Sequence, residues 1–156
     1  NDIVDRELII AGDGPRRENL ESIAADLDIS NVTFRGYVSN KEKRSLFRNS
    51  YCYVLPTKME GFGLTNLEAM ASGCVVVSTD TPGVRDYLCD GENGRMIPSN
   101  DAEALANTIR ELLENPEDAK ELAKEGRATA EAHDIAKTVA HEQTVLEGIL
   151  ASVIEK

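Results

Sequence analysis

Basic residues are scarce in this sequence of 156 residues. It holds 17 lysines and arginines against 28 aspartates and glutamates, a formal net charge of −11. Proteins that bind the phosphate backbone of nucleic acids carry basic patches, so this balance argues against nucleic-acid binding. Residues 101–156 hold 13 of the acids and 6 of the bases. We interpret that excess as the solvated faces of surface helices.

Long apolar runs and metal-ligand patterns are also missing. No run approaches the ~20 apolar residues that span a bilayer, and residues 1–7 show no basic, cleavable leader. Cys52, Cys74 and Cys89 include no Cys-x-x-Cys pair, so we expect free thiols in a reducing compartment. His133 and His141 lack the spacing of a metalloprotease helix. We therefore expect a cytoplasmic protein with no metal site.

Short apolar runs alternate with amphipathic stretches along the chain. The runs lie at residues 8–11, 32–37, 51–55, 74–78 and 95–97. Runs that are apolar on both faces, separated by helical patterns, indicate buried parallel strands. The sequence predicts a single α/β domain, a Rossmann-like parallel sheet with helices on both faces. Its core would cover residues 8–133, followed by a C-terminal helix at 135–153.

Several helix boundaries carry sequence signals. Pro15 is suited to the first position of a helix. The segments 39–42 (Ser-Asn-Lys-Glu) and 100–103 (Asn-Asp-Ala-Glu) are typical of capping boxes. Asn115-Pro116 ends one helix and opens the next, and Gly73 is a C-cap. Turn chemistry explains Gly73, Pro82-Gly83 and Asn93-Gly94.

A glycine turn follows the first predicted strand. Gly12 and Gly14 match the start of the dinucleotide-binding fingerprint, but that fingerprint needs a small residue where Arg17 stands. No acidic residue follows the second predicted strand, which leads to Val38 and Ser39. We therefore do not expect NAD binding. A glycine-bearing turn from strand to helix explains Gly14-Pro15 about as well as a ligand does.

The most informative segment is a glycine loop that enters a predicted helix. Gly61 and Gly63 flank Phe62, and the helix is predicted over residues 64–71. Residues without a Cβ let the backbone approach a ligand closely. The start of a helix presents unpaired N–H groups and the positive end of the helix dipole. The loop is therefore predicted to bind a phosphate or another anion.

Two carboxylates flank this loop. Glu60 precedes it, and Glu68 lies about one turn into the helix, where its side chain leans back towards the loop. One carboxylate can accept hydrogen bonds from two adjacent hydroxyls of a sugar. Phosphate and sugar hydroxyls together predict a nucleotide sugar as the ligand. The acid–nucleophile pair of a glycoside hydrolase is the alternative, but a hydrolase has no use for an anion loop.

These residues resemble the retaining glycosyltransferases of family 4, in the C-terminal, donor-binding half of the GT-B fold. The resemblance covers residues 8–130. It rests on EGFGLTNLEAMASGCVVVSTDTPGVRDYL at 60–88, with support from LIIAGDGP at 8–15, NVTFRGYVSNKE at 31–42, YCYVLPTKMEGF at 51–62 and DGENGRMIPSNDAEALANTI at 90–109.

The resemblance implies a role for each matching residue. Glu60 would act at the reacting centre by contacting hydroxyls of the donor sugar, and Glu68 would hold the ribose. The reaction would transfer a hexosyl unit to a glycan or lipid-linked acceptor without a metal or other cofactor. The remaining contacts to sugar, diphosphate and base would come from Gly61, Phe62, Gly63, Leu64, Thr65, Gly36, Tyr37 and Val38, with Gly12 at the border of the pocket.

The resemblance also implies what this chain lacks. The family's donor domain begins with one more strand and helix before the equivalent of Leu8, which carry cations for the donor diphosphate. The N-terminal acceptor-binding domain would be a partner. We therefore expect the chain alone to bind nucleotide diphosphates weakly and to transfer no sugar. Two alternatives stay open: a non-catalytic nucleotide-sugar module or partner subunit, and an epimerase, although an epimerase would need a histidine before His133.

Two surface features allow more than one interpretation. Lys41, Lys43, Arg44 and Arg48 form the one basic cluster, which we interpret as a solvated helix face. Contact with an anionic membrane surface is the alternative, since lipid-linked acceptors reside there. The apolar stripe of the predicted helix at 135–153 would pack on its own domain or on a second copy of the chain.

Overall fold

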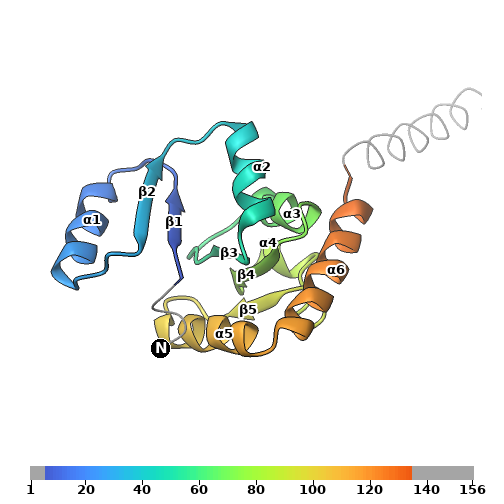
Figure 1. Cartoon of the computed structure of the whole chain (residues 1–156). Coiled ribbons are helices and arrows are strands. Elements are labelled where there is room, and N and C mark those ends of the chain that lie inside the picture. The colour runs from blue at the N-terminus through green and yellow to red at the C-terminus, as the bar shows by residue number, and fades with distance from the viewer. Residues whose placement is uncertain (1–5, 135–156) are drawn as a thin grey trace, which may run out of the picture.

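The structure is a computed structural model that describes residues 6–134. Five strands and six helices alternate over most of this length (Figure 1). The strands are β1 (Leu8–Ala11), β2 (Val32–Gly36), β3 (Cys52–Leu55), β4 (Val75–Thr79) and β5 (Arg95–Ile97). The helices are α1 (Arg17–Asp26), α2 (Asn40–Asn49), α3 (Leu64–Ala71), α4 (Pro82–Arg85), α5 (Ala102–Glu114) and α6 (Pro116–Ala132).

All strand pairings between these elements are parallel, as the sequence predicted, but they form two sheets. β1 pairs with β2, and β4 lies between β3 and β5. In Figure 1, β1 is on the side of its sheet that faces the second sheet. Within residues 6–134, neither β1 nor β3 has a strand on its other edge. We call residues 8–38 the first lobe and residues 52–132 the second lobe; α2 lies between them.

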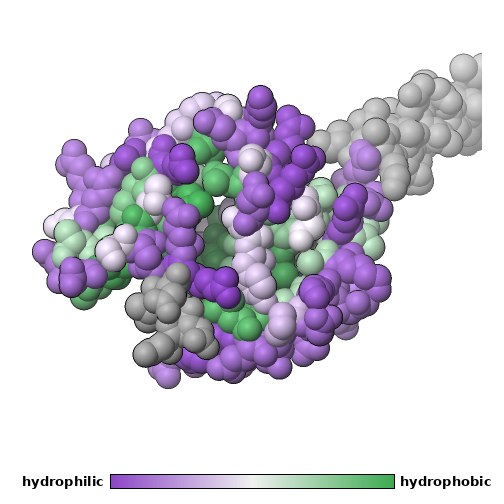
Figure 2. All heavy atoms as spheres, viewed as in Figure 1, coloured by the Kyte–Doolittle hydropathy of each residue, from purple (hydrophilic) through white to green (hydrophobic). Residues whose placement is uncertain are grey.

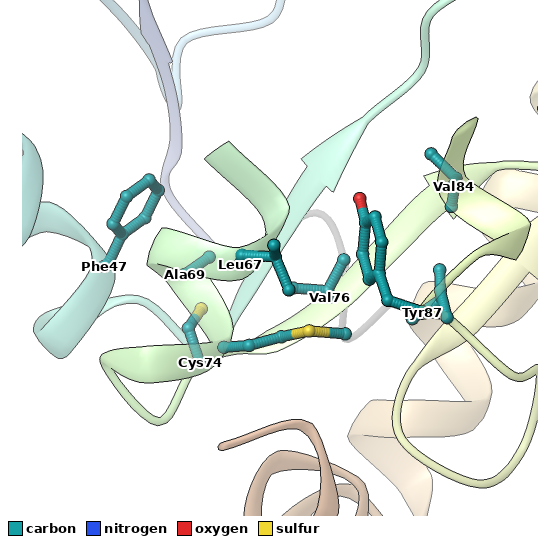
Figure 3. Close-up of a cluster of buried hydrophobic side chains, with 9 residues drawn as sticks. Phe47, Leu67, Ala69, Cys74, Val76, Val84 and Tyr87 are labelled. Atoms are coloured by element: carbon teal, nitrogen blue, oxygen red, sulfur yellow. The ribbon is translucent and has the colours of Figure 1, made fainter. Parts of the chain in front are cut away.

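The core sits in the second lobe, on both faces of β4. All five residues of β4 are buried. Val76 packs into a cluster with α3 and α4 residues (Figure 3), while Val75 and Val77 pack against α5 and α6 on the opposite face. Successive side chains of a strand point to opposite faces. The continuous valine run is therefore explained by helices on both faces, which confirms the predicted layering.

The first lobe has no comparable core. Its helix α1 buries no residue. Leu20, Ile23 and Leu27, apolar residues at helical spacing, are 41%, 44% and 65% exposed. The helical periodicity is present, but no described element covers the apolar face. Figure 2 shows hydrophobic residues at the surface between the two lobes.

The predicted helix boundaries meet with mixed outcomes. The capping box of Ser39 and Glu42 is confirmed at the start of α2, and Pro116 opens α6. The box predicted at Asn100 is wrong. Asn100 takes a left-handed conformation, with φ of 59°, so Asp101 becomes the N-cap and accepts from the Ala104 amide. α1 also starts later than predicted, because Pro15 lies in the preceding turn.

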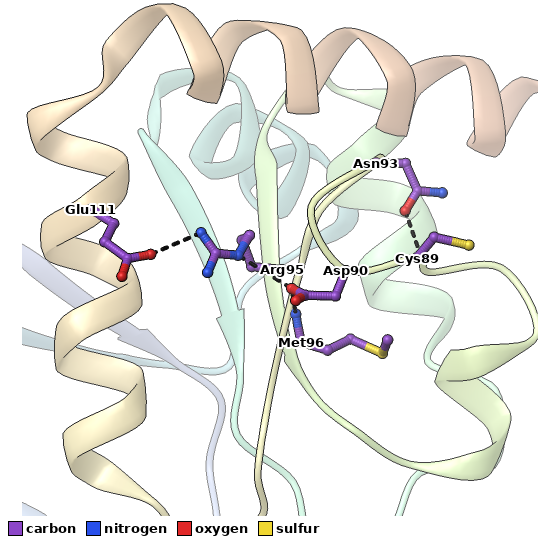
Figure 4. Close-up of polar contacts among 6 residues, drawn as sticks. All are labelled: Cys89, Asp90, Asn93, Arg95, Met96 and Glu111. Atoms are coloured by element: carbon purple, nitrogen blue, oxygen red, sulfur yellow. Dashed lines mark hydrogen bonds and ion pairs between the residues drawn. The ribbon is translucent and has the colours of Figure 1, made fainter.

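Beyond the site region, an ion-pair network fixes β5 to α5 (Figure 4). Arg95 bridges Asp90 and Glu111, at 3.2 Å and 3.1 Å. The same Asp90 carboxylate accepts from the Met96 amide, which holds the turn before β5. These charges are partly exposed, so their role is to fix geometry rather than to add much stability. The helix predicted at 135–153 lies outside the described residues.

Candidate functional site

The glycine loop lies beyond the carboxyl end of β3 and runs directly into α3. The Glu60 carboxylate accepts hydrogen bonds from the backbone amides of Gly61 and Gly63, at 3.0 Å and 3.1 Å. Gly63 has a left-handed backbone, with φ of 73°, and α3 begins at Leu64. The loop amides therefore bind an anionic group, and the one they hold is the loop's own carboxylate.

The backbone of this loop rests on α4. A Cβ on Gly83 would lie 2.0 Å from the carbonyl oxygen of Gly61, so only glycine fits. The prediction that Pro82-Gly83 is a turn is wrong: Pro82 opens the short helix α4, and Gly83 is needed for close approach. Gly94 has the same role, since a Cβ there would lie 2.9 Å from the Val76 carbonyl oxygen.

Glu68 lies on the exposed side of α3 and forms an ion pair with α2. The Lys43 ammonium is 2.6 Å from a carboxylate oxygen of Glu68, and the two side chains are 26% and 44% exposed. The sequence interpretation of Lys43 as part of a solvated face missed this contact. Only the packing of α2 against α3 brings the two residues together. The partner fixes the carboxylate while leaving it open to solvent.

A tyrosine that sequence reasoning did not select lies near both carboxylates. The Tyr53 hydroxyl is 3.1 Å from the Thr65 hydroxyl at the start of α3. Burial raises the pKa of Tyr53, and the negative charges of Glu60 and Glu68 raise it further. The phenol therefore stays protonated at neutral pH and holds the first turn of α3 by a neutral hydrogen bond.

The residues predicted to border the nucleotide base belong to the first lobe. The Gly12 amide donates to the Gly36 carbonyl at 2.7 Å, which joins the ends of β1 and β2. Gly36 has φ of 65°, and the Arg17 guanidinium lies over it, 2.7 Å from where a Cβ would be. Tyr37 is 86% exposed, and Val38 follows it. The structure thus divides the predicted site: the base turn is on one lobe, and the glycine loop with both carboxylates is on the other.

A cavity of about 450 Å³ opens between α2 and α3 beside Glu68. Its lining residues are Asn40, Lys43, Arg44, Arg48, Glu68, Ala71 and Ser72. Two of the arginines that sequence analysis assigned to a basic surface therefore face a hollow next to the predicted ribose carboxylate. Across residues 6–134, no cluster of three or more His, Cys, Asp or Glu side chains is arranged to hold a metal ion. Every helix in the same range is too short or too polar to cross a bilayer.

The sequence of this chain matches a known protein family. The family model for glycosyl transferases group 1 matches residues 1–129. The chain belongs to the group 1 glycosyltransferase family. Among curated members, putative glycosyltransferase EpsD of Bacillus subtilis (strain 168) is 35% identical over 133 residues, which is 85% of this chain and 34% of EpsD. Phosphatidyl-myo-inositol mannosyltransferase of Mycobacterium leprae is 38% identical over 112 residues, 71% of this chain and 29% of that protein.

Solved structures also have the same fold as this chain. Sucrose-phosphate synthase from Thermosynechococcus elongatus matches 94% of this chain and 39% of its own, with a TM-score of 0.82 and 28% identity. HepE of Anabaena, solved in complex with UDP-glucose, matches 96% of this chain and 43% of its own, with a TM-score of 0.82 and 22% identity. The second match shows the fold alone. The chain spans about a third of the length of the curated relatives it matches.

Proposed function

We propose that this chain is the donor-binding part of a retaining glycosyltransferase, which binds a nucleotide-diphosphate sugar. The observation that carries the proposal is the carboxylate of Glu60 on the amides of Gly61 and Gly63. A loop that holds an internal carboxylate presents the donors that a diphosphate or a sugar hydroxyl needs. The start of α3 adds unpaired N–H groups and the positive end of a helix dipole at the same place.

The two carboxylates would have separate roles. Glu60 would leave the loop amides when a donor enters, and would then accept hydrogen bonds from the sugar at the reacting centre. Glu68 would accept from the ribose hydroxyls, in the orientation that Lys43 fixes. Phe62, Leu64 and Thr65 would contribute amides to the sugar and diphosphate. Gly36, Tyr37 and Val38 would border the base, and Gly12 would lie at the border of the pocket.

The relatives support the proposed class of substrate. The names of the relatives include a mannosyltransferase, a rhamnosyltransferase and a glucosyltransferase, which supports transfer of a hexosyl unit to a glycan or lipid-linked acceptor. Helix N-termini and loop amides stabilise a departing diphosphate electrostatically. We expect the reaction to need no metal, because these amides and cations from the rest of the protein would hold the diphosphate.

The rest of the enzyme would complete both the sheet and the site. A strand with a following helix would fit between β1 and β3, since both strands have an unpaired facing edge and the α1 apolar face is uncovered within the described residues. An acceptor-binding domain would close over the donor. We expect the 156-residue chain alone to show no sugar transfer.

A membrane-linked acceptor would also require a membrane-facing surface. The basic side of α2, with Lys41, Arg44 and Arg48, is the place where an anionic bilayer would meet this chain. Co-sedimentation with vesicles, with and without anionic lipid, tests this contact. Binding that does not depend on anionic lipid would exclude it.

Titration calorimetry of the chain with UDP, GDP and ADP tests the proposed function. We expect weak binding of at least one nucleotide, and a loss of about tenfold in Glu68→Gln, because a hydrogen bond to a charged acceptor is worth about 1.5–3 kcal/mol. Glu92→Gln, an exposed carboxylate in the turn before β5, is the matched control and should bind like the wild type. Failure of all three nucleotides to bind, or full affinity in Glu68→Gln, contradicts the proposal.

A further inference from the structure

A buried polar cluster lies directly beneath the glycine loop. Asn66 and Ser78 are fully buried, and Tyr87 is 4% exposed. The Asn66 side-chain amide donates to the hydroxyls of Ser78 and Tyr87, both at 3.0 Å. The Tyr87 hydroxyl in turn donates to the Gly63 carbonyl oxygen at 3.2 Å. Three elements, α3, β4 and the segment after α4, are thereby linked to one peptide of the loop.

This cluster is costly for a protein core. Buried polar groups lose their water and regain only part of that free energy through internal hydrogen bonds. Among the residues that the structure describes, the Asn66 side-chain carbonyl oxygen has no hydrogen-bond partner. Apolar side chains of similar size would fill the same space beside Met70 and Val84. The polar cluster therefore has a purpose other than filling the core.

Tyr87 contacts the loop in three ways. Its hydroxyl bonds to the Gly63 carbonyl, and it leaves no room for a larger residue, since a Cβ on Gly63 would lie 2.5 Å from the hydroxyl oxygen. Its ring packs against Phe62, with ring centroids 5.4 Å apart. The same Gly63 carbonyl also accepts from the Asn66 backbone amide at 2.8 Å. Asn66 and Tyr87 thus fix the Gly63–Leu64 peptide, which contains the first amide of α3.

We propose that Tyr87 and Asn66 are positioning residues that hold the loop amides in the geometry required to bind a diphosphate. This inference rests on the proposed function. A carbonyl held from beneath fixes the plane of the Gly63–Leu64 peptide, and therefore the direction of the Leu64 N–H on its other side. Hydrogen-bond donors that are fixed before the ligand arrives bind it more tightly, because binding then costs no conformational entropy for ordering the loop.

The test compares the affinities of nucleoside diphosphates and monophosphates for the full 156-residue chain. UDP and UMP share the base, the ribose and the first phosphate. The ratio of their affinities therefore measures how much the second phosphate contributes to binding. In Tyr87→Phe we expect UDP to bind at least fivefold more weakly and UMP to bind unchanged, so that the ratio falls. General destabilisation would lower both affinities alike and leave the ratio unchanged. GDP with GMP and ADP with AMP are the parallel pairs.

Tyr51→Phe is the matched control. The Tyr51 hydroxyl also donates to a backbone carbonyl, but its acceptor is Leu112 on α5 and not a residue of the glycine loop. We expect the wild-type ratio in this variant. Ser78→Ala keeps the Tyr87 hydroxyl and removes the second acceptor of Asn66; we expect a smaller fall in the ratio. It provides a second test if Tyr87→Phe does not fold.

The outcomes separate the two ideas. If the wild type binds none of the diphosphates, the proposed function fails and the inference fails with it. If the wild type prefers diphosphate over monophosphate and folded Tyr87→Phe keeps that preference, the inference alone is wrong. A fall in the ratio in Tyr87→Phe but not in Tyr51→Phe supports it.

Discussion

The first lobe and the second lobe have the same kind of strands and helices but differ in burial. In residues 8–38, Gly36 is the single buried residue. In the second lobe, β4 is buried along its whole length and carries helices on both faces. Burial of apolar surface is the main source of stability. The comparison therefore shows that the periodic pattern of a strand or helix does not by itself provide a core.

The predicted site contains residues of both lobes. The glycine loop, Glu60 and Glu68 belong to the well-packed second lobe, whereas Gly12 and the turn at residues 36–38 belong to the first. Well-packed elements thus hold the loop amides proposed to bind a diphosphate, where a fixed geometry matters most. The turn predicted to border the base lies on the lobe with little buried surface, where local opening requires less free energy.

Hydrogen exchange should reveal the largest contrast between the lobes. We expect the amides of β4 to exchange through global unfolding, and those of β1 and β2 to exchange through local opening at a free energy lower by several kcal/mol. The measurement is native-state exchange followed by NMR at increasing denaturant. Equal protection in β1 and β4 would contradict the comparison.

One apolar substitution in each lobe tests the difference in burial between the lobes. Met70 is fully buried under α6, and Met70→Ala should lower the free energy of unfolding by about 2–5 kcal/mol through the cavity it leaves. Leu20→Ala, at a 41% exposed position of α1, should change it by no more than ~0.5 kcal/mol. Urea denaturation of the two variants and the wild type measures both changes in the free energy of unfolding. A Leu20→Ala loss as large as that of Met70→Ala would mean that α1 is covered in solution.

The contact between the glycine loop and α4 allows a test within the second lobe. Gly83→Ala places a Cβ against the Gly61 carbonyl, and should cost about 1–3 kcal/mol in stability and displace the loop. Gly14→Ala is the control, because a Cβ there meets nothing within 4 Å. Thermal denaturation and the NMR shift of the Gly61 amide are the readouts. If Gly83→Ala has the stability and the Gly61 amide shift of the wild type, the loop does not rest on α4.

Cysteine reactivity gives the smallest and most local effect. Cys89 is exposed, while burial raises the pKa of Cys74 to about 12. The thiolate is the reactive form, so Cys89 should be alkylated first at pH 8 and Cys74 last. Because the folded pKa of Cys74 is raised, its protonated form stabilises the fold at neutral pH. This contribution decreases as the pH rises above the unfolded value of 9.0 towards 12. Mass spectrometry of timed alkylation checks the order, and faster reaction at Cys74 would contradict the burial.

Much of the local structure could be predicted from single residues and their spacing. The capping box at Ser39 and Glu42 depends on residues three apart, and the loop from Glu60 to Gly63 depends on four consecutive residues. The box predicted at Asn100 failed although its pattern was as good. There the backbone of Asn100 took a left-handed conformation, which a pattern of side chains does not encode.

The sequence by itself determined the order of parallel strands and helices and the anion-binding glycine loop, since periodicity and glycine act over a few neighbouring residues. It also determined the membership of a glycosyltransferase family. The tertiary structure decided the split of the sheet, the ion pair of Lys43 with Glu68, and the cluster of Asn66 and Tyr87 beneath the loop. Those contacts join residues 21 or more positions apart, and only the packing of α2, α3 and α4 around β4 brings such residues together.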